Sequence, residues 1–68
     1  MENLINFINN RYAKAVKYPA TALIMCDQAF GALEYHYTVN PQDFSECEAY
    51  WNEMRPKFYE AYMGGDAV

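Results

Sequence analysis

The sequence predicts an all-α fold, a compact three-helix bundle in a single domain, and three observations lead to that expectation. Apolar residues recur at spacings of three and four, which is the period of an amphipathic helix rather than of a strand. Two prolines, Pro19 and Pro41, divide that pattern into three segments. The chain has 68 residues, enough for one domain, and the short connections between its segments favour antiparallel neighbours.

The first predicted helix spans about residues 2–17. Its apolar residues form one stripe, which comprises Leu4, Ile5, Ile8, Tyr12, Ala15 and Val16. The residue before a proline is pushed out of the helical region, and proline is favoured in the first turn of a helix. We therefore expect Tyr18-Pro19 to end this helix and to begin the next.

The second predicted helix spans about residues 20–38. Its apolar residues alternate at spacings of three and four and form the clearest seam in the chain, which comprises Leu23, Cys26, Phe30, Leu33 and Tyr37. Gly31 costs about 1 kcal/mol of helix stability relative to Ala, so we expect it to mark a close approach of another backbone. The small residues Ala22, Ala29 and Ala32 would also let a second helix come near.

The third predicted helix spans about residues 41–63. Asn40 is expected to accept a hydrogen bond as the N-cap, with Pro41 in the first helical position. The apolar stripe of this helix comprises Phe44, Cys47, Trp51, Met54, Phe58 and Ala61 or Tyr62.

Two features of the third helix predict departures from a straight rod. Pro56 lies inside the pattern and removes one backbone hydrogen bond, which predicts a kink near residues 52–55, with two short helices as the alternative. Gly64-Gly65 predicts a left-handed C-cap, and residues 65–68 are expected to fray.

The acidic composition disfavours several classes of partner. Nine acidic residues against five basic ones give a net charge of −4, so the chain would repel nucleic-acid phosphates. The longest apolar run, Ala22–Cys26, is far shorter than the roughly 20 residues of a membrane span. Residues 1–10 lack the pattern of a secretory signal. We expect a cytoplasmic protein without a nucleic-acid or membrane partner.

The residues that commonly carry chemistry do not form a motif for a catalytic, metal or cofactor site. Cys47 and His36 are offset by only about one helical turn, but no glycine between Gly31 and Gly64 could form an oxyanion-donor loop beside them. Cys26 and His36 are separated by about 15 Å along one helix, so they cannot share a metal ion. Folding back near residue 40 leaves the two thiols of Cys26 and Cys47 about 10 Å apart along the axis, too far for a disulfide. We expect two buried, inert thiols, a His36 that pairs with Asp43 or contacts Phe44 across the turn, and no enzymatic activity.

Charge is segregated along the chain. Residues 1–17 hold three basic residues against Glu2, whereas the remainder holds two basic residues against eight acidic ones. The predicted third helix carries a row of acidic residues beside its seam, interrupted by Tyr50 and by Lys57, which is placed to pair with Glu53. We interpret seven residues as a partner-binding surface: Asp43, Glu46, Tyr50, Glu53 and Glu60, with Tyr35 and Tyr59. The alternative interpretation is a solvated face whose tyrosines also contact the first helix.

In its brevity, its acidity and its lack of a catalytic motif, the chain is similar in style to the small accessory proteins with which phages and other mobile elements bind and block a host protein. The sequence thus favours an inhibitor or adaptor that docks on a basic surface of another protein. The alternative is a structural protein that assembles into a homo-oligomer through its small residues or its surplus aromatic side chains.

Overall fold

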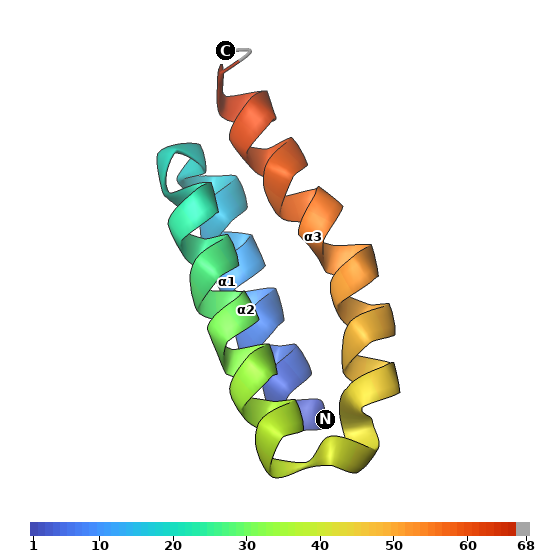
Figure 1. The fold of residues 1–68 in the computed structure, drawn as a ribbon. Coiled ribbons are helices and arrows are strands. Elements are labelled where there is room, and N and C mark those ends of the chain that lie inside the picture. The colour runs from blue at the N-terminus through green and yellow to red at the C-terminus, as the bar shows by residue number, and fades with distance from the viewer. Residues whose placement is uncertain (67–68) are drawn as a thin grey trace.

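The computed structural model describes residues 1–66 and confirms the prediction of an all-α three-helix bundle. The three helices are α1 (Glu2–Lys17), α2 (Ala22–Val39) and α3 (Phe44–Asp66), and they run up, down and up (Figure 1). Two one-turn 3₁₀-helices, η1 (Pro19–Thr21) and η2 (Pro41–Asp43), lead into α2 and α3. No helix in the described part of the chain is long and apolar enough to cross a membrane.

The two connections share one backbone conformation, which the prolines impose. Tyr18 has φ −128° and ψ 78°, and Asn40 has φ −125° and ψ 73°. This is the extended region into which a residue before proline is forced, so the predicted helix breaks occur where expected. The Asn40 side chain does not act as the predicted N-cap. Instead, its Nδ2 donates at 3.1 Å to the His36 carbonyl, which also accepts the Asn40 backbone N–H at 2.8 Å.

The core lies between the three helices and confirms most of the predicted stripe on α3. Cys47, Trp51, Met54 and Phe58 are buried, and Phe58 is completely inaccessible. The Tyr12 ring meets the Phe58 ring edge to face, with the centroids 5.6 Å apart, and so links α1 to α3. At the start of α3, Phe44 is 48 % exposed, in contrast to its predicted place in the core.

The buried face of α2 differs from the predicted seam. The buried residues are Ala22, Met25, Cys26, Ala29 and Leu33, whereas Leu23 and Phe30 are 40 % and 39 % exposed. Cys26 and Leu33 of the predicted seam are buried, but the helix is rotated so that Ala22, Met25 and Ala29, rather than Leu23 and Phe30, share their face. On the side of α2 next to this face, Arg11 on α1 donates to Gln28 at 3.2 Å. The physical reason for the rotation of α2 is that small side chains on its inner face let α1 pack along it.

Gly31 does not mark a close approach of another backbone, so that prediction was wrong. A Cβ atom at this position would have no neighbour within 4 Å, and the residue is exposed. The small residues of α2 that lie in the core are instead Ala22 and Ala29, which are completely buried. Gly31 lies on the outer surface of α2 and has no role in packing.

The third helix is continuous through Pro56, so the alternative of two short helices was wrong. Figure 1 shows α3 bending over its middle turns, as expected where a proline removes a backbone hydrogen bond.

The predicted C-cap is also wrong, because α3 continues through Gly64 and Gly65 to Asp66 and no described glycine has a positive φ. This end of α3 projects beyond the other two helices, so no packing contact turns the chain back (Figure 1). Residues 65 and 66, for which fraying is predicted, are helical in the structure, and residues 67–68 lie outside the described residues.

Replacing Gly31 with Ala should stabilise the fold by about 0.5–1 kcal/mol, because Ala loses less backbone entropy in a helix and the site has room for its Cβ. Urea denaturation followed by circular dichroism measures the change. A loss of stability would show that another group approaches Gly31 in solution.

Candidate functional site

An acidic row lies along the outer surface of α3. Glu46, Glu53 and Glu60 are all exposed and follow one another at intervals of seven residues, which is close to two helical turns. Lys57 Nζ lies 4.0 Å from Glu53 Oε1, as the spacing of these two residues predicts. Both side chains of this pair are well exposed, so the ion pair contributes little to stability. We refer to Glu46, Glu53 and Glu60 as the acidic row.

Tyr50 lies beside the acidic row but is partly buried and fixed. Its hydroxyl donates to Asn9 Oδ1 on α1 at 3.0 Å. Burial, and then the charge of Glu53, raise the pKa of the Tyr50 phenol above its ordinary value. Tyr50 therefore stays neutral and ties α3 to α1, as in the alternative interpretation in which tyrosines contact the first helix.

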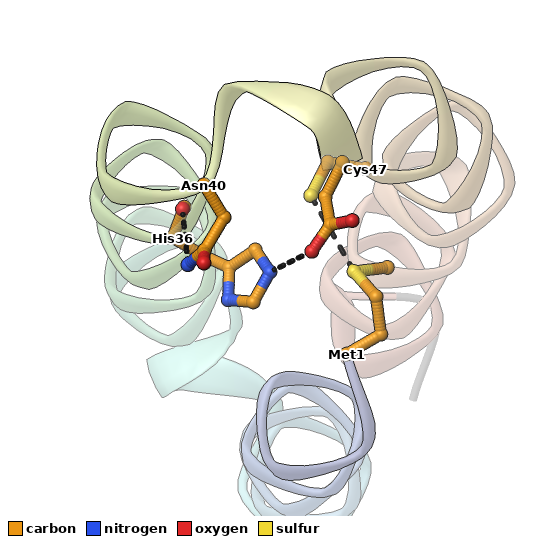
Figure 2. A network of polar contacts seen from close by, with 5 residues as sticks. Met1, His36, Asn40 and Cys47 are labelled. Atoms are coloured by element: carbon orange, nitrogen blue, oxygen red, sulfur yellow. Dashed lines mark hydrogen bonds and ion pairs between the residues drawn. The ribbon is translucent and has the colours of Figure 1, made fainter.

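Asp43 is engaged at the end of the bundle where α2 turns into α3. Its Oδ2 lies 2.8 Å from His36 Nε2, which confirms the predicted pairing across the turn. Figure 2 shows the His36 ring reaching across this turn while the Asn40 side chain folds back onto the end of α2. The Asp43 carboxylate thus holds the turn together and is less available to a partner than the glutamates of the row.

Tyr35 and Tyr59 lie away from the acidic row. Tyr35 is on α2 and is 73 % exposed. Tyr59 is on α3, but it lines a hollow between α2 and α3, whereas Tyr50 contacts α1 on the other flank of the helix. The structure therefore brings Glu46, Glu53 and Glu60 together with Tyr50 and places the other predicted residues on separate surfaces.

Both thiols are buried and unpaired, as predicted. Cys47 is completely inaccessible, and its Sγ lies 3.6 Å from the Met1 Sδ (Figure 2). Burial, and then nearby carboxylates, raise the pKa of both Cys26 and Cys47 above the ordinary thiol value. A thiol with a raised pKa is a poor nucleophile at neutral pH, because only the thiolate reacts. Among residues 1–66 no group of three or more His, Cys, Asp or Glu side chains could hold a metal ion.

A second surface, which the sequence analysis did not identify as a site, is an apolar groove between α2 and α3. Its floor is Trp51, and the Phe30 ring lies beside it with the centroids 5.5 Å apart. Tyr37 and Phe44 line the end of the groove near the turn between α2 and α3, and Tyr59 lines the opposite end. We call this surface the α2–α3 groove. The signal that could have revealed it is the number of large apolar residues on α2, which exceeds what one buried face holds.

Three charged side chains line the α2–α3 groove. Glu48 lies toward the turn, and Asp27 and Arg55 lie toward the other end. The Arg55 guanidinium lies over the Tyr59 ring, 5.9 Å from its centroid. Within the described part of the chain, neither Arg55 nor Glu48 forms an ion pair. The groove therefore presents aromatic rings together with charges of both signs.

Comparisons of the chain with protein-family models, with curated protein sequences and with solved structures find no match.

A thiol reagent at pH 8 should modify both cysteines of the native protein at least about 100-fold more slowly than in denaturant, because burial excludes the reagent and disfavours the thiolate. Mass spectrometry of the labelled protein measures both rates. Equal rates in the native and denatured protein at either cysteine would contradict the burial described for that thiol.

Proposed function

We propose that this protein is a small protein-binding module, an accessory or inhibitor protein that docks through the acidic row of α3 on a basic surface of another protein. The single observation that carries the proposal is the alignment of three exposed carboxylates, from Glu46, Glu53 and Glu60, on one helical surface. The proposal involves no catalytic step and places the protein in the cytoplasm, where its two thiols stay reduced.

The charges of the acidic row are spaced so that each one is available to a partner. Successive members are about 10.5 Å apart along the helix, more than the screening length of about 8 Å at physiological ionic strength, so they repel one another little and each meets a partner's charge separately. Glu46 and Glu60 have no ion-pair partner among the described residues, and the Lys57 contact to Glu53 is long and exposed. These carboxylates are therefore free to exchange water for lysine or arginine side chains of a partner.

The acidic row is also held in place before any partner binds. Tyr50 lies between Glu46 and Glu53 and is anchored to Asn9 on α1, while Trp51 and Met54 pack into the core. A rigid surface loses little conformational entropy on binding. Long-range attraction between this row and a basic surface would speed encounter, and covering that surface would block other acidic ligands, nucleic acid among them.

Reversing two charges of the row, with Glu46→Lys and Glu53→Lys, should weaken binding to the purified partner by at least about 100-fold, because like charges would then face each other. The partner is first obtained by capture from an extract of the native host and is then purified, and calorimetry at two salt concentrations measures the affinity.

The matched control is the variant with Glu2→Lys and Glu34→Lys, which changes the net charge equally on α1 and α2. It should bind with less than about tenfold loss of affinity, because it keeps the row intact. Equal losses in the two variants would show that overall charge, rather than the acidic row, determines binding.

A further inference from the structure

Along the side of α3 that lines the α2–α3 groove, aromatic, charged and polar side chains follow nearly the same order from either end. Five residues follow this side of the helix at spacings of three and four: Phe44, Glu48, Asn52, Arg55 and Tyr59. An aromatic ring stands at each end, an acidic and a basic residue stand inside them, and a polar amide lies at the centre. A helix surface with this order is complementary to itself when a second copy is turned end to end.

We propose that two copies of this chain associate through the α2–α3 groove as a two-fold symmetric dimer in which the two α3 helices run antiparallel. A two-fold axis between Trp51 and Asn52 brings Glu48 opposite Arg55 of the second copy, and it brings Phe44 opposite Tyr59 of the second copy. Two-fold symmetry makes each of these contacts twice. Glu48 and Arg55 thereby find partners that they lack within one chain.

The second helix follows the same symmetry. Leu23, Phe30 and Tyr37 are spaced by seven residues, close to two helical turns, and therefore lie in one line. Phe30 lies beside Trp51 and so stands at the height of the axis, where it meets Phe30 of the second copy. Leu23 then lies opposite Tyr37 of the second copy. This accounts for the partial exposure of Leu23 and Phe30, which the sequence pattern assigns to a seam.

The other two-fold pairing of the same faces has its axis parallel to the helices and sets α2 of each copy against α3 of the other at the same height. Because Phe30 pairs with Trp51 and Tyr37 with Phe44 in one chain, Glu34 would then face Glu48 of the second copy, and Asp27 would face Arg55. The antiparallel dimer sets Glu48 against Arg55 but brings Asp27 near Glu34 of the second copy, so opposite and like charges meet in both pairings. The Glu48→Arg variant separates them, because it weakens the antiparallel dimer and strengthens the parallel one.

The dimer leaves the acidic row uncovered. Glu46, Glu53 and Glu60 lie on the flank of α3 opposite Tyr59, so they remain exposed when the groove is closed. The dimer therefore displays two acidic rows in a fixed arrangement. It goes beyond the proposed partner binding, because either interaction could occur without the other.

Sedimentation equilibrium of the full chain over a range of concentrations tests the dimer. The native protein should pass from one 7.9 kDa chain to twice that mass as its concentration rises. The single variants Glu48→Arg and Arg55→Glu should each weaken association by at least about tenfold, since each sets like charges opposite one another across the axis.

The double variant, Glu48→Arg with Arg55→Glu, restores opposite charges across the axis and should dimerise more strongly than either single variant. Asp27 lies beside position 55 in the groove, so the recovery should be partial. Glu2→Arg, the same charge change at an exposed position of α1 outside both surfaces, is the matched control and should not weaken association. Circular dichroism checks that each variant is folded.

A native protein that stays monomeric at millimolar concentration would overturn the proposal and leave the groove to a different protein. A Glu48→Arg variant that dimerises as tightly as the native chain would overturn the pairing with Arg55. A double variant that does not dimerise more tightly than both single variants would overturn it too.

Discussion

The close packing of α1 along the alanine face of α2 is the constraint on which the rest of this structure depends. Ala22 and Ala29 are completely inaccessible, and Ala15 on α1 is inaccessible as well. Where two helices meet through small side chains, their backbones approach closely and dispersion contacts accumulate along the whole length. In a chain of 68 residues, in which core volume is scarce, this contact sets the rotation of α2 about its own axis.

The rotation of α2 determines what remains for α3 and for the surface. With the alanines turned inward, α3 packs into the side of the pair and supplies the large core residues Trp51 and Phe58, while Phe30 is left half covered beside Trp51. The α2–α3 groove is therefore a consequence of how α1 and α2 meet. The acidic row lies on the other flank of α3, held by the Tyr50 contact to α1. One helix thus presents two chemically different surfaces.

Local signals in the sequence predicted the helix breaks, the stripe of α3 and the pairing of His36 with Asp43, because proline geometry, a 3.6-residue period and a short turn act over a few residues. The rotation of α2 could not be predicted in this way. Its apolar side chains occupy more than one face, and only tertiary packing decides whether Leu23 and Phe30 or Ala22 and Ala29 are buried. Helical spacing alone predicts the acidic row and the separation of Tyr59 from it, because position 59 is rotated by about 100° from Glu60. It does not predict that Tyr59 lines a groove with Phe30 and Trp51, because that depends on how α2 packs.

The unfolding free energy of an Ala29→Leu variant shows whether α2 packs through the face that holds its buried alanines. The added side chain should cost about 1–3 kcal/mol, because no space is free at a completely buried alanine in a packed core. Ala49→Leu on the exposed side of α3 is the control and should change stability by less than about 0.5 kcal/mol. An Ala29→Leu variant as stable as the native protein would contradict the account, because it would mean that α2 does not pack through its alanines.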